Sequence, residues 1–538
     1  MRRPAMSGLD TALTPLRFLE RSLEAHPDRE AIVDGPRRFT YRQMAETVQN
    51  LAEGLVRRGL QPGDTVAVLA PNSAEALIAH YAVPLAGGVL VALNTRLAPP
   101  EVEYILGHSE VKFLFGDAGL LQPIIDAGAA NGVETIVVHP DEDGTPGEVG
   151  AADLSVEAYA DWTASAPESP RPYEIDDETA TITVNYTSGT TGRPKGVMYT
   201  HRGAYLNSLG EVITQGFAPL TRYLWTLPMF HCNGWCTTWA LTAVSGTHVC
   251  IRAVRGPEAW RLIDEENVTR MAGAPVVLNT IAGAKEAYNM DGALSITTAG
   301  APPSPTTIAL LEGLGIEVIH VYGLTESYGP YSSCEPQPEW TGLPVEERAK
   351  LKSRQGIGMI SADRMRVVEL RDDDVLTDVP RDGVTMGEIV MRGNNVMKGY
   401  LNAPEATAEA FRGGWFHTGD LAVMHEDGYV QILDRAKDIV ISGGENISTI
   451  EVEQALVAHE SVAEAAVVGM PDEKWGQRPL AYVVLKPGSE VTEADLIAFV
   501  KTRIASYKAP AGIEFVEELP TTSTGKIRKN ALREMAGN

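Results

Sequence analysis

Cysteine is scarce in this chain of 538 residues, which contains four: Cys232, Cys236, Cys250 and Cys334. Four scattered thiols cannot form the disulfide framework that staples a small secreted protein. Cys232 and Cys236 lie near each other in sequence, but no second thiolate pair stands at the spacing of a zinc site. The pattern favours reduced cysteines in a cytoplasmic enzyme.

Basic residues are in the minority, because 45 Lys and Arg stand against 71 Asp and Glu, a formal net charge of −26. This balance argues against nucleic acid or an anionic membrane as the main partner. Any anionic ligand must therefore be met by local hydrogen-bond donors, which suits a closed site for a small molecule.

Long hydrophobic runs are missing too. The longest apolar stretch, Ala76–Leu93, is interrupted by His80, by Pro84 and by the pair Gly87–Gly88. It predicts a buried helix, a turn and a strand rather than a membrane span. The first residues, M-R-R-P-A-M-S-G, lack the apolar core of a signal peptide.

The chain is too long for one hydrophobic core, so at least two lobes are expected. From Phe39 to about residue 430, strand-like runs alternate with helix-like stretches such as Tyr41–Arg57 and Pro257–Glu266. The strand-like runs include Thr65–Leu69, Lys112–Phe115, Thr135–Val138, Thr181–Asn185, Thr247–Ile251 and Glu317–Val321. Such alternation predicts an α/β fold with a large N-terminal body of mixed, substantially parallel sheets. The segment Gly144–Glu174, rich in Pro, Ala and acidic residues, is predicted to be a surface excursion.

The composition shifts near Asp434, and the last hundred or so residues form a self-contained pattern of their own. Helices are expected at Thr449–Ala458 and Glu493–Ile504, and strands at Ala463–Val468 and Leu480–Leu485. The layout predicts a body of residues 1–434 followed by a small α+β C-terminal lid domain of residues 438–538.

The segment Tyr186–Gly196 reads Y-T-S-G-T-T-G-R-P-K-G. Small residues let backbone N–H groups turn inward, hydroxyls add donors and a lysine supplies charge, so the loop suits a polyphosphate. Its spacing is not that of a Walker loop. A solvated Ser/Thr/Gly linker would have a similar composition, but it would not explain the motifs found downstream.

A second motif, Y-G-L-T-E-S at Tyr322–Ser327, follows the predicted strand Glu317–Val321. Thr325 and Glu326 are therefore expected at the carboxyl end of a strand, where α/β proteins bind ligands. A carboxylate there is a natural Mg²⁺ ligand beside ATP phosphates. The alternative is a carboxylate that merely starts a helix.

Four further motifs complete the set. Thr298–Pro303 offers a tight turn against which a flat base could lie, and Trp415–Asp420 ends in an aspartate that could accept both ribose hydroxyls, although a simple turn explains it equally well. Asp434–Asn446 joins a charged tetrad to a strand and a Gly-Gly turn. Thr522–Lys529 places Lys526 on a turn of small residues, where a lone lysine is ordinarily solvated surface.

Taken in order, these segments resemble the signatures of the adenylate-forming superfamily of acyl-CoA synthetases, luciferases and peptide-synthetase adenylation domains, over roughly residues 15 to 535. The runs P-M-F-H-C-N-G-W-C (Pro228–Cys236), Y-G-L-T-E-S-Y-G-P (Tyr322–Pro330) and P-E-W-T-G-L-P-V-E-E-R-A-K-L-K-S-R-Q-G look like one branch. That branch contains short- and medium-chain acyl-CoA ligases, including plant acyl-activating enzymes and bacterial methylmercaptopropionate-CoA ligases. The resemblance implies an acyl-CoA synthetase-like fold with a mobile lid.

The resemblance also implies roles for individual residues. The β- and γ-phosphates of ATP would be held by Thr187, Ser188, Gly189, Thr190, Thr191, Gly192 and Lys195. Adenine would lie between the segment Gly300, Ala301 and Pro302 and the segment Tyr322 and Gly323. Thr325 would reach the α-phosphate, Glu326 would hold Mg²⁺, and Asp420 and Arg435 would fix the ribose. Lys526 would bridge the substrate carboxylate and the α-phosphate.

By the same resemblance, residues 435–437 form a hinge centred on Lys437, although a surface linker would also suit that lysine. The turn of Ser442, Gly443, Gly444 and Glu445 would form part of the CoA channel. The acyl pocket would be lined by His231, Trp235, Tyr328, Gly329 and Cys334, near Gly300. Trp235 could equally be ordinary core, and His231 a gate or a packed ring. His320 departs from the Asp or Asn of some relatives and is left out of the site.

The expected activity is an ATP-dependent carboxylate–CoA ligase that releases AMP and pyrophosphate, with ATP, Mg²⁺ and CoA as cofactor and co-substrates. Transfer to an amine or a carrier protein, activation of another small anion, and luciferase-like oxidation remain alternatives. A non-catalytic nucleotide-binding protein is disfavoured because Lys526, Glu326 and Asp420 are all present. A homodimer fits the family, and the identity of the acid stays open.

Overall fold

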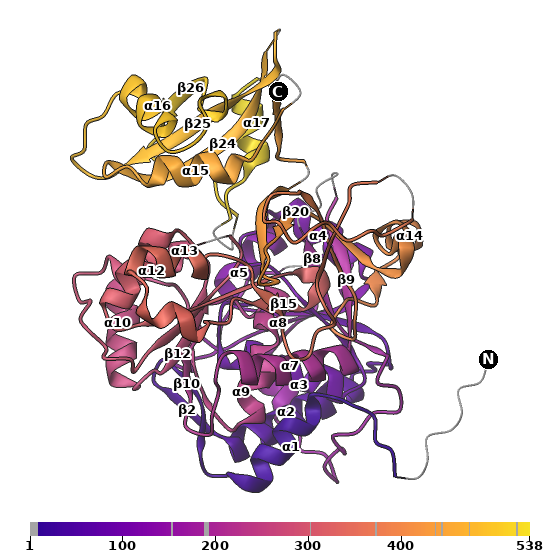
Figure 1. Ribbon diagram of the computed structural model, residues 1–538. Helices are drawn as coiled ribbons and strands as arrows, with labels where there is room; N and C mark the ends of the chain where they lie inside the picture. The colour runs from indigo at the N-terminus through magenta and orange to yellow at the C-terminus, as the bar shows by residue number, and fades with distance from the viewer. Residues whose placement is uncertain are drawn as a thin grey trace.

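The computed structural model describes residues 9–537 except 152–153, 188–192, 302, 372–373, 436, 443–444, 473 and 523–525. It contains a large body and a smaller C-terminal domain, drawn in yellow above the body in Figure 1. The predicted α/β fold with a smaller second domain is confirmed.

Two large sheets organise the body within the described residues. The first has eight strands in the order β19 (Gly399–Tyr400), β9 (Lys195–Thr200), β8 (Thr181–Thr187), β4 (Val89–Ala92), β3 (Thr65–Leu69), β5 (Val111–Gly116), β6 (Thr135–Val138) and β7 (Val156–Ala158). The strands from β8 to β7 run parallel, and β9 and β19 are antiparallel additions at one edge.

The second large sheet has nine strands among the described residues and a parallel centre from β14 to β1. Their order is β16 (Ile357–Gly358), β15 (Gly329–Ser333), β14 (Glu317–Leu324), β13 (Ser295–Thr298), β12 (Arg270–Gly273), β10 (Arg222–Leu224), β11 (Thr247–Val249), β1 (Glu30–Asp34) and β2 (Arg37–Thr40). The body also has an antiparallel sheet of β17 (Arg366–Val368), β18 (Gly387–Met391), β20 (Phe416–Met424) and β21 (Val430–Arg435).

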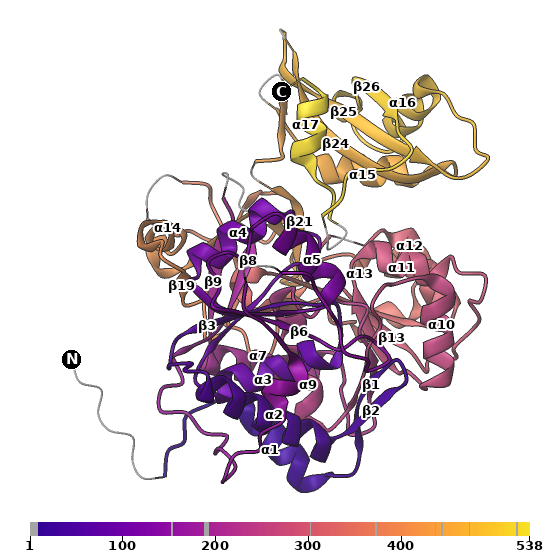
Figure 2. The same cartoon turned by 180° about the vertical axis from the view of Figure 1, so that it is seen from behind.

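Helices form layers between and outside the two large sheets. The helix bounds in the body are α1 (Leu16–Ala25), α2 (Tyr41–Arg57), α3 (Ala74–Leu85), α4 (Pro99–His108), α5 (Ala118–Asp126), α6 (Tyr159–Thr163), α7 (His201–Thr214), α8 (Cys232–Trp235), α9 (Thr237–Ala243), α10 (Gly256–Glu265), α11 (Pro275–Ala282), α12 (Pro305–Gly313), α13 (Val345–Lys352) and α14 (Pro404–Ala410). Figure 2 shows α10, α11 and α12 together on one side of the body, with α2 and α3 at its base.

Successive side chains of a strand face opposite sides of the sheet, so each strand contributes to the hydrophobic cores on both of its faces. In β3, Val66 and Val68 join the core between the two large sheets, which also takes residues from α1, α2, α3, α7 and α9. Ala67 and Leu69 join the core beneath α4 and α5. A third core lies between the nine-stranded sheet and α10, α11 and α12. The strands are buried on both faces, as a parallel sheet requires.

The C-terminal domain has a sheet of its own with the described order β23 (Glu445–Ile447), β22 (Val440–Ser442), β25 (Gly476–Leu485) and β24 (Val462–Asp472), and β26 (Gly512–Phe515) pairs with β25. Its helices are α15 (Thr449–Val457), α16 (Glu493–Lys501) and α17 (Lys529–Met535). Each face of the sheet has a small core, one under α15 and α16 and one under α17.

The segment Gly144–Glu174 is not the simple surface excursion that its composition predicts. Its residues 156–158 form the edge strand β7, and Trp162 in α6 is fully buried. The Trp162 ring packs edge-on against Phe113 and Phe115 at 5.0 and 5.1 Å between centroids. Tyr159 and Tyr173 are buried in the same core, so three aromatic side chains anchor the segment.

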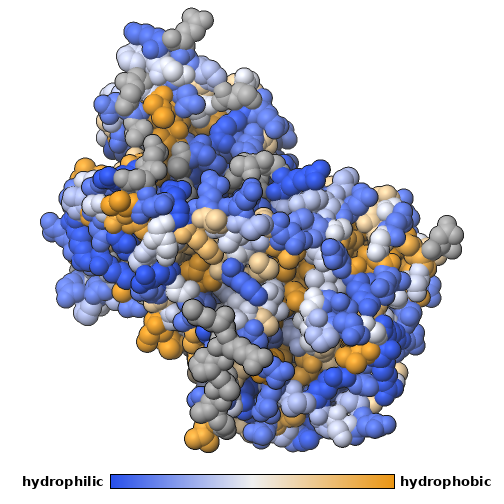
Figure 3. All heavy atoms as spheres, turned by 90° about the vertical axis from the view of Figure 1, so that its right-hand side faces the viewer, coloured by the Kyte–Doolittle hydropathy of each residue, from blue (hydrophilic) through white to orange (hydrophobic). Residues whose placement is uncertain are grey.

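The surface is mainly hydrophilic, with hydrophobic residues scattered over the face shown in Figure 3. In the part of the chain that the structure describes, no helix is both long and apolar enough to cross a membrane.

An acidic side chain, Glu211, is fully buried on α7 in the central core. Gln215, one turn further along the helix, donates from Nε2 to Glu211 Oε2 at 2.5 Å. Burial raises the pKa of Glu211 from 4.5 to about 8. The folded protein therefore holds a proton on this carboxyl group at pH values where the unfolded chain has released it.

The substitution Glu211→Gln is expected to stabilise the fold in alkaline solution. Because the folded pKa is raised, the stability that Glu211 contributes is full below pH 4.5 and is lost as the pH rises towards about 8. A neutral amide avoids that loss, so the gain in unfolding free energy at pH 8 should be on the order of 3 kcal/mol. Thermal unfolding of both proteins from pH 5 to pH 8.5 measures it.

The exposed Glu46→Gln on α2 is the control and should leave the pH profile unchanged. A Glu211→Gln protein whose melting temperature follows that of the parent in parallel across the pH range would contradict the assignment.

Candidate active site

The predicted phosphate segment joins two strands of the eight-stranded sheet. Thr187 ends β8 and pairs across the antiparallel ladder with Lys195, which begins β9. The predicted phosphate ligands Ser188, Gly189, Thr190, Thr191 and Gly192 lie outside the described residues. The strand β8 runs parallel to β4, so the segment leaves the sheet at the carboxyl edge of parallel strands.

Three predicted ribose and adenine residues lie together on β14, β20 and β21. Tyr322 donates its hydroxyl hydrogen to Asp420 Oδ2 at 2.6 Å, and Arg435 Nε lies 3.1 Å from Asp420 Oδ1. Asp420 and Arg435 are also direct partners in the β20–β21 ladder. The carboxylate of Asp420 raises the pKa of Arg435, and burial together with Asp420 raises the pKa of Tyr322. All three side chains are therefore fixed before any ligand arrives.

Thr325 and Glu326 belong to the short 3₁₀ turn η1 (Thr325–Ser327), directly after β14. Tyr199 of β9 donates its hydroxyl hydrogen to the Thr325 carbonyl at 2.6 Å. Tyr400 of β19 donates to Glu326 Oε1 at 2.9 Å, and the Met397 amide donates to the Glu326 carbonyl at 2.7 Å. The edge strands β9 and β19 thus hold the predicted metal ligand in place.

Tyr400 also faces the phosphate segment. The Lys195 ammonium lies 4.8 Å from the centre of the Tyr400 ring, within the range of a cation–π contact. Tyr400 is therefore the side chain that connects Lys195 with Glu326. The sequence analysis did not identify it, because 74 residues separate Tyr400 from Glu326.

Lys526 reaches this site from the C-terminal domain. A Cβ atom on Gly300 would stand 3.3 Å from Lys526 Cε, so the aliphatic part of the lysine passes over Gly300. Gly300 has φ +92°, a conformation that residues with a side chain rarely adopt, so the backbone favours glycine there. Burial lowers the pKa of Lys526 and nearby Arg435 lowers it further, while Cys232, Asp420 and Glu326 act in the opposite direction.

The predicted acyl segment has an unusual backbone. Cys232, Asn233, Gly234, Trp235 and Cys236 all have φ between 52° and 60°, so α8 is a left-handed turn. Each non-glycine residue in this conformation costs roughly 1–2 kcal/mol, and proteins normally use it for single residues. A run of this length must be held by its surroundings, and such strain is found mainly at functional sites.

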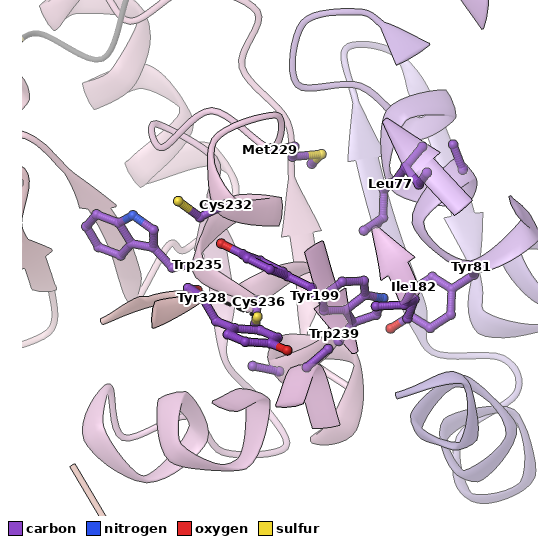
Figure 4. Close-up of a cluster of buried hydrophobic side chains, with 14 of the residues drawn as sticks. Leu77, Tyr81, Ile182, Tyr199, Met229, Cys232, Trp235, Cys236, Trp239 and Tyr328 are labelled. Carbon is purple, nitrogen blue, oxygen red and sulfur yellow. Dashed lines mark hydrogen bonds between the residues drawn. The ribbon is translucent and has the colours of Figure 1, made fainter. Parts of the chain in front are cut away.

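The turn directs its side chains to different neighbours, as Figure 4 shows. Trp235 lies against the start of β15, where a Cβ atom on Gly329 would stand 2.9 Å from Trp235 Cβ. The Cys232 thiol donates to Thr325 Oγ1 at 3.5 Å, and burial raises the pKa of Cys232 to about 11. Burial and Lys526 lower the pKa of His231 to about 3, so this ring is neutral at physiological pH.

The side chain of Tyr328 is packed in the core and does not line an open cavity. Its ring stacks on Tyr199 with centroids 3.9 Å apart, and its hydroxyl accepts from the Thr200 amide at 2.7 Å. Its neighbour Gly329 has φ +100° and lies against Trp235. Position 323 must also be glycine, because the Gly329 carbonyl lies so close to its backbone that a Cβ atom would stand 1.9 Å from the oxygen.

The structure separates Cys334 from the other residues predicted for the acyl pocket. Its side chain packs in a small cluster with Trp340 and Tyr429, and its thiol donates to the Leu351 carbonyl at 3.3 Å. Gly329 is the first residue of β15 and Cys334 directly follows its last, so the place of Cys334 in the acyl pocket stays a prediction.

The remaining predicted residues lie beside the centre or in the other domain. Ala301 follows Gly300 and is exposed, and Pro302 lies outside the described residues. Ser442 and Glu445 pair across β22 and β23 in the C-terminal sheet, and Ser442 also pairs with Gly476 of β25. Gly443 and Gly444 lie outside the described residues. Lys437 is exposed at the connection, and partial desolvation by its surroundings lowers its pKa.

The sequence matches the family model named AMP-binding enzyme over residues 19–401 and the model named AMP-binding enzyme C-terminal domain over residues 451–526. The chain therefore belongs to the AMP-binding enzyme family, and the predicted membership of the adenylate-forming superfamily is confirmed. The acyl-activating branch is also the one in which its curated relatives lie.

Two of these relatives are plant enzymes. The chain is 43% identical to the acetate–CoA ligase CCL3 of Humulus lupulus, over 98% of this chain and 95% of that protein. It is 42% identical to the peroxisomal acetate/butyrate–CoA ligase AAE7 of Arabidopsis thaliana, over 99% and 96% of the two chains. Among solved structures, ATP-bound MatB from Rhodopseudomonas palustris superposes with a TM-score of 0.82 at 28% identity, over 97% of this chain and 98% of that one.

The substitution Tyr322→Phe is expected to weaken AMP binding about tenfold, because Asp420 loses a hydroxyl donor that fixes its carboxylate. Isothermal titration calorimetry with AMP measures the change. The control is Tyr331→Phe on β15, which removes a buried hydroxyl bonded to the Asp363 and Arg392 carbonyls away from this cluster. Equal affinities of the two variants would argue against the arrangement.

Proposed function

We propose that this protein activates a short- or medium-chain carboxylic acid with ATP and transfers the acyl group to CoA, releasing AMP and pyrophosphate. The enzyme class, an AMP-forming acid–thiol ligase, is that of the curated relatives aligned over nearly the full length of the chain. The observation that carries the proposal is Lys526, which lies within the cluster of Gly300, Arg435 and Asp420.

In the first step, a carboxylate oxygen of the acid attacks the α-phosphorus of ATP. The bond from that phosphorus to the bridging oxygen breaks, and pyrophosphate leaves with the electron pair. Two anions must approach each other, so alignment of the reactants and a nearby positive charge contribute most to lowering the activation free energy. Lys526 would bridge the carboxylate and the α-phosphate, with Thr325 beside the same phosphate.

The other nucleotide groups follow the same assignment. Asp420 and Arg435 would hold the ribose, and Tyr322, Gly323, Gly300, Ala301 and Pro302 would enclose the adenine. Thr187, Lys195 and the loop 188–192 would hold the β- and γ-phosphates. Thr187 ends β8 and Thr325 follows β14, so two of these groups would come from the carboxyl ends of parallel strands, where α/β proteins bind ligands.

Mg²⁺ is proposed as a cofactor held by Glu326 and the ATP phosphates. Among the described residues, no group of three or more His, Cys, Asp or Glu side chains is placed to hold a metal ion. A single carboxylate nevertheless fits, because Mg²⁺ is usually bound by one or two carboxylates together with substrate phosphates. When bound, the ion would neutralise phosphate charge. Tyr400, hydrogen-bonded to Glu326, would fix the orientation of this ligand.

In the second step, the CoA sulfur attacks the acyl carbon of the acyl-adenylate. A C–S bond forms, the bond from the acyl carbon to the AMP oxygen breaks, and the thiol proton goes to solvent. Lys526 must withdraw for this. We propose that residues 438–538 rotate as a lid on the hinge 435–437 around Lys437, against a body of residues 1–434. That rotation would bring Ser442, Gly443, Gly444 and Glu445 to the CoA channel.

The acyl pocket is proposed between the left-handed turn and β15, with His231, Trp235 and Gly329 at its walls. Tyr328, whose ring is packed in the core, would support the start of β15. A tryptophan is large and rigid, so Trp235 against Gly329 favours short or medium acids over long chains. A cytoplasmic location and a homodimer stay predictions.

The direct test is pyrophosphate release from ATP with a panel of C2–C12, methylthio and aryl acids, with and without CoA. Release without CoA is expected for short and medium acids and locates adenylation, and CoA should stimulate turnover. Release that CoA leaves unchanged would favour transfer to an amine or a carrier protein. No release with any carboxylate would overturn the proposal.

The substitution Lys526→Ala should reduce adenylation by about 10²–10³-fold, because one well-placed cation contributes this much to a charged transition state. Thioester formation from supplied acyl-adenylate and CoA should stay close to the parent rate. Single-turnover kinetics of each half-reaction measure both quantities.

The exposed Lys501→Ala on α16 is the matched control and should change neither half-reaction. Equal loss of both half-reactions in Lys526→Ala would remove this lysine from its proposed role.

A further inference from the structure

The left-handed turn Cys232–Cys236 needs an external restraint, and the structure contains one. Asn233 is completely buried, and its Oδ1 accepts two hydrogen bonds from β8. Thr183 Oγ1 donates to it at 2.9 Å, and Asn185 Nδ2 donates to it at 2.9 Å. Asn185 Nδ2 also donates to Thr183 Oγ1 at 3.2 Å, so the three side chains form a closed ring.

The ring joins two parts of the site that are far apart in sequence. Thr183 and Asn185 lie on one face of β8, two residues apart, and Asn233 is 50 residues away from Thr183. The same strand ends at Thr187, where the phosphate segment begins. The acyl turn is therefore fastened to the strand that leads into the nucleotide site.

Further contacts show which side chains depend on this restraint. The Thr238 hydroxyl donates to the Asn233 carbonyl at 3.1 Å, which ties the turn to α9. On the next residue, a Cβ atom on Gly234 would stand 2.4 Å from the Trp225 ring, so the backbone is pressed against that ring. With Asn233 and Gly234 both held, the Cα–Cβ direction of Trp235 is set, and it points to Gly329.

We propose that the Thr183–Asn185–Asn233 ring is a positioning device for acyl-chain length. It holds the left-handed turn so that Trp235 stays against Gly329 and closes the pocket to long acids. The inference rests on the proposed function and goes beyond it, because it assigns specificity to side chains that need not touch the acid. Each of the three ring residues acts through Trp235 and is a positioning residue, not a catalytic one.

The test uses two substitutions of the same residue in the full-length protein. Thr183→Val keeps the shape and removes the hydroxyl, whereas Thr183→Ser keeps the hydroxyl. In Thr183→Val the ratio of kcat/KM for octanoate to that for butanoate should rise about tenfold, the effect of one lost buried hydrogen bond. Thr183→Ser should keep the parent ratio. Asn185→Ala removes the second donor of the ring and should shift the ratio in the same direction.

A matched control separates specificity from general loss of stability. Thr65→Val on β3 of the same sheet removes a hydroxyl that donates to the Ser109 carbonyl at 2.7 Å, and it should leave the ratio unchanged. The inference would be overturned if kcat/KM fell by the same factor for every acid in Thr183→Val and Asn185→Ala. It would also be overturned if Thr183→Ser changed the ratio as much as Thr183→Val does. Failure of the parent protein to release pyrophosphate with any acid would instead overturn the proposed function.

Discussion

Burial of a positive charge beside another positive charge is the constraint on which the site depends. Lys526 lies near Arg435, and the carboxylates of Asp420 and Glu326 are among the groups that offset these two cations. Such an arrangement is costly unless negative charge is present, and the reaction brings the phosphates and the carboxylate that supply it. The cluster is therefore suited to two anions that must react with each other.

The layered body makes this cluster possible. Because β8 and β14 lead out of different sheets, their ends can approach one site from two directions, and the edge strands β9 and β19 join them. Tyr199 and Tyr400 each donate a hydroxyl hydrogen to η1, so the nucleotide residues of one sheet are held by strands of the other. The lysine comes from a domain with separate cores, as the proposed rotation of that domain requires.

Much of this could be predicted from sequence because the signals are local. Alternation of apolar residues located β3 and α2 at their observed bounds, and the glycine and hydroxyl pattern indicated a phosphate segment between β8 and β9. Gly300 belongs to a motif whose small residue is required by a positive φ, and Gly323 to one whose small residue is required by the close approach of the Gly329 carbonyl. Composition did not reveal that Gly144–Glu174 is anchored, because it does not show that Tyr159, Trp162 and Tyr173 are buried.

The sequence by itself determined the two α/β units, the order of the motifs and the types of side chain proposed to meet the nucleotide, since each follows from short-range pattern or backbone freedom. Only the tertiary structure decided that Tyr400 meets Glu326, that Cys334 packs with Trp340 and Tyr429, and that Cys232–Cys236 is left-handed. Cys, Asn and Trp carry no local preference strong enough for that turn. It exists because packing against Trp225 and hydrogen bonds from β8, made only after the chain has folded, outweigh the strain of the backbone.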